Sequence, residues 1–243
     1  MEPFQDRAIV LQVRDQGDAH QWVTLLTETR GKMTVFAAAA RKSRKRFGGG
    51  LDLGTLLNAQ FSERREGRLQ LESVDIEQSL PAIRDDLASL ARAFYCLELV
   101  RELVRENESQ AELFALLADY LTALNEKSVG PTSLLAFQLD VLTCAGLKPR
   151  LDVCTLCAQR ADEFTRFDPE HGGVVCKNCW PRLTSSWTLT GEVLGHLRAL
   201  QLGEKKPMAK PSRDSAQTLL DKFIIHQLGK PIRSRSFLAQ MGE

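Results

Sequence analysis

Four of the six cysteines in this 243-residue chain form two closely spaced pairs. Cys154 and Cys157 bound the motif CTLC, and Cys176 and Cys179 bound CKNC after eighteen intervening residues. Each C-x-x-C turn can present two thiolates to one ion, and two such turns complete a tetrahedral, sulfur-only shell of the kind that holds zinc. The spacing therefore predicts one Zn²⁺ per chain. Because four thiolates leave no open coordination position, we expect this zinc to be structural.

The segment between the two cysteine pairs has the pattern of a short hairpin. Its apolar residues alternate about the turn DPEHGG, and they are Phe164, Phe167, Val174 and Val175. The pattern predicts a zinc ribbon over about residues 151–182, with His171 in the turn rather than on the metal. Two disulfides or four buried thiols are the alternatives, although thiols stay reduced in the cytosol.

The stretch RKSRKRFGGG, residues 41–50, is the second feature with a potential chemistry. Its five cations are Arg41, Lys42, Arg44, Lys45 and Arg46. Because 32 Lys and Arg nearly cancel 31 Asp and Glu over the chain, any basic function must be local. The run could bind the phosphates of a nucleic acid or could be a solvated loop. Phe47 could stack on a base or anchor the loop on its domain.

A second basic group lies in GKPIRSRSFL near the end of the sequence. Lys230, Arg233 and Arg235 flank apolar residues there. A nucleic-acid contact and a tail pinned by its apolar residues are both consistent with this pattern.

Common catalytic motifs are missing from the sequence. It contains no phosphate-binding G-x-x-x-x-G-K-[ST] loop, no G-x-S-x-G elbow and no H-E-x-x-H pair. The pattern favours a binding or assembly protein over an enzyme. No segment is long and apolar enough for a membrane span, and the first residues lack the features of a secretory signal, so we expect a cytosolic protein without a membrane partner.

The hydrophobic pattern predicts an α+β protein with two domains. Residues 1–80 contain five short strand patterns with turn residues between them, which predicts a small barrel, either an OB-fold or an SH3-like barrel. The predicted strands are 8–14, 22–27, 32–40, 55–64 and 68–76. Residues 81–243 follow a helical period and form the predicted helical domain, with the zinc module embedded in it. No long linker separates the two, so we expect them to pack together.

Several helices are predicted in the second domain. The first carries an apolar stripe, and the next begins at Ser109 with Glu112 in a capping box. The stripe consists of Leu87, Leu90, Phe94, Leu97 and Val104. A central helix runs from Pro131 to Gly146, and two more cover about residues 190–202 and 212–228.

Taken in order, these pieces resemble the RecO family of recombination mediators. The resemblance runs almost end to end, from AIVLQVRDQGDAHQWVTLLTETRGKMTVFAAAARKSRKRFGGG through GRLQLESVDI and FDPEHGGVVC to LGKPIRSRSFL. It implies an N-terminal OB-fold that binds nucleic acid, a helical domain with a zinc module, and no catalytic activity. It also implies binding of single- and double-stranded DNA, annealing of complementary strands, and action with RecR and the single-strand-binding protein SSB so that RecA can load. The implied location is the bacterial cytoplasm, in association with the nucleoid.

An SSB partner would present the acidic, apolar tail that the resemblance implies. A receptor for such a tail needs a hydrophobic groove with cations beside it, and we expect Arg92, Arg101 and Arg105 on the first long helix to provide the cations. Two other classes compete: a zinc-ribbon and OB-fold factor that acts on RNA in transcription or translation, and a metal-dependent nuclease. The nuclease requires an open metal site or a carboxylate cluster that the sequence does not show.

Overall fold

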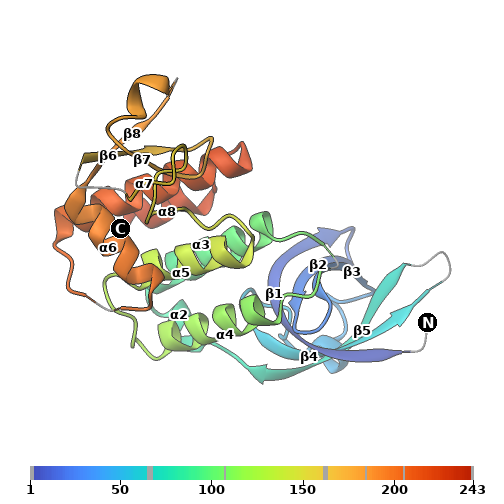
Figure 1. Cartoon of the computed structure of the whole chain (residues 1–243). Coiled ribbons are helices and arrows are strands. Elements are labelled where there is room, and N and C mark those ends of the chain that lie inside the picture. Colours follow the sequence, from blue (N-terminus) through green and yellow to red (C-terminus); the bar gives the residue numbers. More distant parts are fainter. Residues whose placement is uncertain are drawn as a thin grey trace. The chain divides into compact units, whose positions relative to one another are not determined.

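A computed structural model describes residues 3–64, 68–106, 108–160, 164–183, 185–204 and 206–241. Its backbone contacts divide the chain into two compact units. Figure 1 shows the helices and strands along the chain. Unit 1 comprises residues 1–129 and 232–242, and unit 2 comprises residues 130–231. The elements of unit 1 are β1 (Phe4–Gln16), β2 (His20–Thr27), β3 (Gly31–Ala37), α1 (Arg44–Phe47), β4 (Leu56–Glu63), β5 (Leu69–Gln78), α2 (Pro81–Arg84), α3 (Leu87–Leu103), α4 (Ala111–Asn125) and α8 (Ser234–Gln240). Those of unit 2 are α5 (Ser133–Cys144), β6 (Phe164–Asp168), β7 (Gly173–Val175), the 3-10 helix η2 (Trp180–Arg182), β8 (Trp187–Thr190), α6 (Gly191–Gln201) and α7 (Lys210–Leu228).

The five strands of unit 1 form a closed barrel in the order β1-β2-β3-β5-β4, with β4 pairing back onto β1. All neighbours are antiparallel except β3 and β5, which meet in parallel at Phe36 and Gln70. This strand order is that of an OB-fold. The predicted five-stranded OB barrel is therefore confirmed.

Side-chain alternation builds the barrel interior. Along β3 every second residue is buried, so Met33 and Val35 point inward while Thr34 and Phe36 stay partly exposed. The strand ends at Ala37, three residues earlier than predicted, because Ala39 turns the chain with a φ of 55°. The interior is filled mainly by Val10, Val23, Leu25, Met33, Val35, Phe47, Leu57, Phe61 and Leu71.

The helices of unit 1 pack on the barrel and on one another. Helix α3 contacts β1, α4 and α8, and α4 also contacts β2. The expected packing of barrel against helices is confirmed within unit 1. The division into domains at residue 80 stays a prediction, because the compact unit joins α2, α3, α4 and α8 to the barrel.

The helices of unit 1 differ in two details from what the sequence pattern suggests. The apolar stripe on α3 is only partly buried, with Leu87 60% exposed at the start of the helix, and residues on other sides of α3 are buried as well. These residues include Ala91, Tyr95, Cys96, Leu99 and Val100. Helix α4 begins at Ala111 after an N-cap at Gln110 that makes no side-chain bond, so the capping box predicted at Ser109 does not form.

Unit 2 combines three helices with a small sheet. The sheet order is β7-β6-β8, and α5, α6 and α7 contact one another in pairs. Left-handed Gly146 and Gly229, with φ of 74° and 68°, follow the ends of α5 and α7 as predicted. Strand β8 is an element that the hydrophobic pattern did not reveal. Among the helices of the described ranges, none has the length and apolar character needed to span a bilayer.

Candidate nucleic-acid interface and metal centre

The basic loop after β3 is folded around one buried aromatic ring. Residues 44–47 form the short helix α1, which ends at left-handed Gly48. Phe47 is only 3% exposed and belongs to the barrel interior. Of the two roles left open for Phe47, the structure supports the anchor, and the proposal that this ring stacks on a base is corrected: a buried ring offers no face to a nucleotide.

The five cations of the loop have different surroundings. Arg41 lies 3.5 Å from the carboxylate of Asp15. The guanidinium of Arg46 donates to Ser43 Oγ and to the carbonyl of Ala38, and lies 4.9 Å from the centre of the Phe47 ring. The remaining three, Lys42, Arg44 and Lys45, are exposed, and no ion pair links them to another residue in the described part of the chain. Three of the five cations are thus available to an anion, while Arg46 holds the loop together.

An aromatic cluster that the sequence reasoning missed lies on the outer face of β2 and β3. Trp22 and Phe36 are direct cross-strand partners, and their ring centres are 5.3 Å apart in an edge-to-face arrangement. The ring of His20 also stacks on Phe36, with their centres 5.3 Å apart. All three side chains are at least partly exposed. In OB-folds this face of strands 2 and 3 is the usual site of oligonucleotide binding.

The other end of the same face is covered. Lys32 Nζ donates to the carbonyl of Arg101 at 2.7 Å, and Thr34 Oγ1 donates to Glu106 at 3.2 Å. The segment that follows α3 therefore lies over the end of β3 that carries Lys32. At the other end of this face, His20 is exposed and Trp22 and Phe36 are partly exposed in the part of the chain that the structure describes.

Backbone bonds join this aromatic cluster to the basic loop. The amide of Ala39 donates to Nδ1 of His20 at 3.1 Å, and the amide of Arg41 donates to the carbonyl of Ala19. The loop thus begins beside the ring of His20. Stacking surfaces and outward cations lie next to each other, which is the combination that single-strand binders use.

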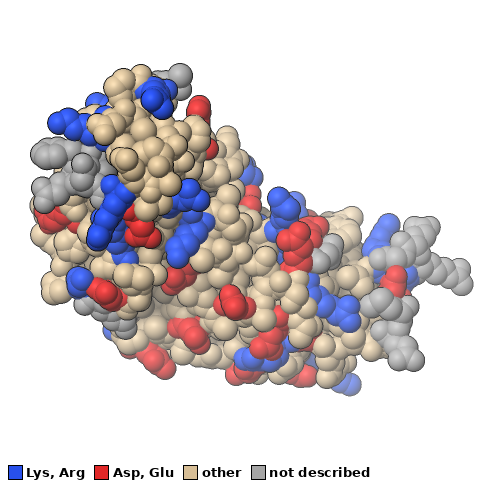
Figure 2. Space-filling model, viewed as in Figure 1, with Lys and Arg blue, Asp and Glu red and all other residues tan. Residues whose placement is uncertain are grey.

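On the face drawn in Figure 2, the described residues do not form one continuous basic surface. Lys and Arg side chains are interspersed there with Asp and Glu. This agrees with the near-zero net charge of +1. An electrostatic attraction for nucleic acid must therefore come from local groups such as the loop.

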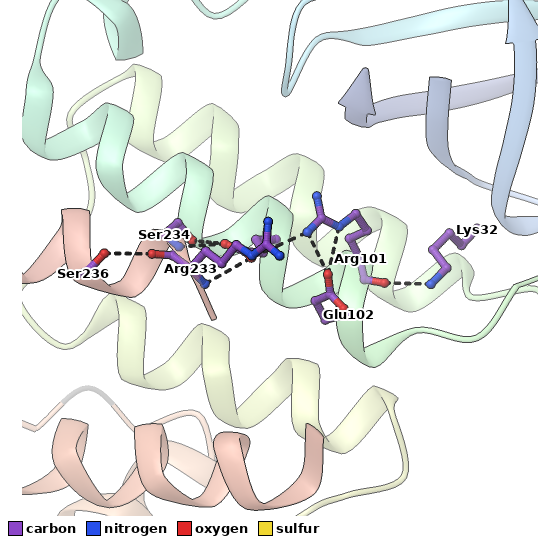
Figure 3. A network of polar contacts seen from close by, with 7 residues as sticks. Lys32, Arg101, Glu102, Arg233, Ser234 and Ser236 are labelled. Atoms are coloured by element: carbon purple, nitrogen blue, oxygen red, sulfur yellow. Dashed lines mark hydrogen bonds and ion pairs between the residues drawn. The ribbon is translucent and has the colours of Figure 1, made fainter. Parts of the chain in front are cut away.

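The C-terminal basic group is tied down by its backbone. Ile232 and Leu238 are buried, and the amides of Arg233 and Ser234 donate to the carboxylate of Glu98 on α3 (Figure 3). The hydroxyl of Ser234 donates to the same carboxylate. The tail is therefore pinned to unit 1, which was one of the two predicted alternatives. The exposed side chain of Arg233 leaves the other alternative, a nucleic-acid contact, open.

The three arginines expected at a partner site differ in their surroundings. Arg101 is bonded within the molecule, at 2.7 Å from Glu102 and 3.6 Å from Glu98 (Figure 3). Helix α3 ends at Leu103, so Arg105 is not on this helix as predicted. It lies in the extended segment beyond, where its side chain is 84% exposed. Arg92 is on α3 and half-buried.

The metal centre consists of the four predicted cysteines. Their sulfur atoms all lie within 4.8 Å of one another, and Cys157 Sγ is 3.7 Å from Cys176 Sγ. Zinc–sulfur bonds of about 2.3 Å in a tetrahedron require sulfur–sulfur distances of about 3.8 Å. The donor set and its spacing therefore fit a tetrahedral metal ion held by four thiolates.

Two tight turns and a hairpin position these sulfurs. In the first turn the amide of Ala158 donates to the carbonyl of Cys154, and Ala158 adopts a φ of 59°. In the second the amide of Cys179 donates to the carbonyl of Cys176 at 3.0 Å. Strands β6 and β7 pair antiparallel between the turns, which confirms the predicted hairpin. His171 bonds Asp168 at 2.6 Å in the hairpin turn and, as expected, is not part of the cluster.

The thiols differ strongly in acidity. Burial opposes ionisation of Cys154, but backbone hydrogen bonds from Cys176, Cys157 and Leu156 lower its pKa to about 6. Burial, reinforced by the neighbouring thiols, raises the pKa of Cys179 to about 12. Cys154 therefore ionises more readily than an ordinary thiol, and Cys179 ionises less readily. Coordination to a divalent cation would deprotonate the thiols outright.

The fold and the cluster together define a class of protein: a closed OB barrel followed by helices and a module whose four cysteines could hold a metal ion. Comparison with known proteins narrows this class. The family described as Recombination protein O N terminal matches residues 1–79, and Recombination protein O C terminal matches residues 84–236. The chain belongs to the RecO family.

Individual relatives agree over the whole length. The chain is 47% identical to a protein from Myxococcus xanthus named DNA repair protein RecO, with 100% of this chain and 99% of the relative covered. Proteins of the same name from Anaeromyxobacter sp. (strain K) and Desulfatibacillum aliphaticivorans are 41% and 31% identical. The alignments cover 96% and 99% of this chain, and 95% and 98% of those relatives.

Proposed function

We propose that this chain is a recombination mediator in DNA repair that binds DNA, anneals complementary strands and helps RecA replace SSB. Membership of the RecO family supports the role in repair, since a relative 47% identical to this chain is named DNA repair protein RecO. The observation that carries DNA binding is the junction of the aromatic face of β2 and β3 with the basic loop, through the bond from Ala39 to His20.

The proposed path of a single strand follows this junction. Bases stack on Trp22 and Phe36, and phosphates meet Lys42, Arg44 and Lys45. Arg41 is available to a phosphate once it leaves Asp15, because an exposed ion pair of this kind is worth at most about 1 kcal/mol. Arg46 acts by holding the loop in shape.

Annealing requires contact with a second strand or a duplex. The proposed second contact consists of Lys230, Arg233 and Arg235. Its support is that the backbone amides of residues 233 and 234 are held by the carboxylate of Glu98. Phosphate contacts carry no base identity, so binding through them is independent of sequence. That independence suits a protein that must act on any broken DNA.

In this proposal the metal is one Zn²⁺ held by Cys154, Cys157, Cys176 and Cys179. When bound, the ion supplies a cross-link between the two cysteine turns. The chain's own residues shape the site: the β6–β7 hairpin brings the turns together, and four sulfurs fill the coordination shell. Such a closed site stabilises a fold and has no open coordination position for catalysis. In this proposal the chain acts as a mediator and not as an enzyme.

The proposed partners are RecR and the acidic tail of SSB, in the bacterial cytoplasm at the nucleoid. Arg92, Arg101 and Arg105 remain the proposed cations for the tail. Arg105 is the most exposed of the three, at 84%, with Glu108 4.0 Å away. Arg101 contributes less, because its side chain is 21% exposed and already binds Glu98 and Glu102. Charge reversal of Arg105 alone should then weaken a fluorescent tail peptide more than reversal of Arg101.

An annealing assay tests the proposed function. Complementary oligonucleotides, one labelled with a donor dye and the other with an acceptor, are mixed with the full chain, with and without an SSB coating. We expect faster pairing in both cases. Tighter binding of structured RNA together with no annealing would instead favour a factor that acts on RNA, and cleavage of the DNA would exclude a mediator.

A further inference from the structure

The outer face of β2 and β3 becomes more buried from one end to the other. Three cross-strand pairs follow one another on it: Trp22 with Phe36, Thr24 with Thr34, and Leu26 with Lys32. Trp22 and Phe36 are partly exposed, whereas Thr24 is only 5% exposed and Leu26 is fully buried. Side chains on one face of a strand recur every two residues, so consecutive pairs are about 7 Å apart. The exposed part of the face therefore ends at the pair that follows Trp22 and Phe36.

The segment after α3, residues 104–106 and 108, is held against this end of β3. Lys32 and Glu106 form a parallel bridge, and Lys32 Nζ donates to the carbonyl of Arg101 at 2.7 Å (Figure 3). A Cβ atom at Gly31 would clash with the carbonyl oxygen of Glu108, so the two backbones are in direct contact there. These contacts involve the backbone on both sides. The segment after α3 is therefore a fixed neighbour of the barrel face.

Glu106 places a carboxylate beside the face itself. Thr34 Oγ1 donates to this carboxylate at 3.2 Å, and Thr34 is the next outward residue of β3 after Phe36. Glu106 is exposed, and none of the ion pairs between described residues includes it, whereas Glu108 lies 4.0 Å from Arg105. A phosphate that followed a base stacked on Phe36 would come within about 7 Å of this carboxylate. Two like charges at that distance in water repel each other enough to weaken binding about threefold.

We propose that Glu106 is a specificity-determining residue that ends the single-strand site at Thr34. A bound strand then occupies only the end of the face that carries the aromatic pair, and it continues toward the basic loop instead of along β3. The cation at the far end does not compete for it, because the ammonium of Lys32 already donates to a carbonyl. This inference rests on the proposed function, since it requires that the face of β2 and β3 binds single strands.

The test is a titration of fluorescein-labelled oligothymidylates of about 4 to 16 nucleotides, the range of site sizes of OB-folds, with the full chain. Glu106→Gln keeps an oxygen that can accept from Thr34 and removes only the charge. We expect this variant to bind the shortest oligonucleotide as the unaltered chain does, and to bind the longest about threefold more tightly. Glu106→Lys adds a phosphate contact, so its salt slope for the longest oligonucleotide should be steeper by about 0.7.

Two further variants make the outcome specific. Glu126→Gln removes the same charge from an exposed position at the far end of α4, about 22 Å along that helix from its start, and should leave binding of every length unchanged. Trp22→Ala should weaken binding of every length at least about fivefold if the face binds the strand.

The variants separate failure of this inference from failure of the proposed interface. If Trp22→Ala weakens binding but Glu106→Gln has the length dependence of the unaltered chain, Glu106 does not end the site, and the interface stands. Equal tightening of the shortest and the longest oligonucleotide by Glu106→Gln would also overturn the inference, because the charge would then act on the whole site. No effect of Trp22→Ala at any length would overturn both the inference and the proposed interface.

Discussion

Neutralising part of the basic loop should change how DNA binding responds to salt. Each phosphate contact on a single strand releases a condensed counterion and contributes about −0.7 to the slope of log affinity against log salt. Arg46 is bonded inside the loop, and Arg41 is paired with Asp15. The other three cations should therefore contribute about −2.1 to this slope, whereas five contacts would contribute about −3.5. In Arg44→Ala/Lys45→Ala the slope should therefore become shallower by about 1.4.

The assay is a fluorescence titration of oligonucleotides of several sequences at several salt concentrations. The loss should be nearly the same for every sequence, because phosphates are common to all of them. Lys148→Ala/Arg160→Ala removes the same charge from exposed positions of unit 2 and serves as the matched control. If the loop variant kept the slope and affinity of the unaltered chain, the loop would be solvated charge only, and the reasoning about its outward cations would be refuted.

The remaining predictions concern the metal and the stability of the fold. Cys176→Ser should lose the metal and destabilise unit 2, because structural zinc binding contributes about 10–16 kcal/mol in peptides at neutral pH. Metal analysis and thermal melting check this prediction. Cys144→Ser, outside the cluster, is the control. Since thiols must ionise to bind metal, zinc should be released as the pH falls, and retention of full stability without metal would argue against a structural role. Glu98→Ala removes three hydrogen bonds at the start of α8 and should lower the free energy of unfolding in urea by about 2–3 kcal/mol. Glu98→Gln keeps one acceptor oxygen and should lower it less. Equal stability of both variants and the unaltered chain would contradict the capping role. Gly31 has a φ of 74°, and a Cβ atom there would clash with the carbonyl oxygen of Glu108. Gly17 has a φ of 60° but open surroundings, so Gly31→Ala should lower the free energy of unfolding by about 2 kcal/mol more than Gly17→Ala. Similar losses in the two variants would mean that the clash at residue 31 relaxes freely.

The barrel and the metal centre were predictable because their signals are local. Alternation along Met33, Thr34, Val35 and Phe36 marks a strand by itself, and the two C-x-x-C motifs define a donor set without knowledge of the fold. The ends of helices at glycine were equally predictable, because glycine is the residue that most often takes the left-handed φ that ends a helix, as at Gly146.

The rest depended on contacts between distant segments. No local pattern near residue 98 indicates that Glu98 caps a helix that starts at Ser234. The helical period of α3 likewise does not indicate that Leu87 stays exposed. The aromatic pair was missed for the same reason. Trp22 and Phe36 occupy outward positions of their strands, which the alternation could have indicated, but only the strand register makes them neighbours.

Photochemical cross-linking is the most direct test of the proposed DNA interface. A single-stranded oligonucleotide with 5-bromodeoxyuridine at alternate positions is irradiated with the full chain, and the linked peptides are identified by mass spectrometry. We predict cross-links to Trp22 and Phe36, lost on competition with unmodified DNA, and an unlinked Phe47 because its ring is buried in the barrel. Cross-links confined to unit 2, with none on β2 or β3, would contradict the claim that the open barrel face binds the strand.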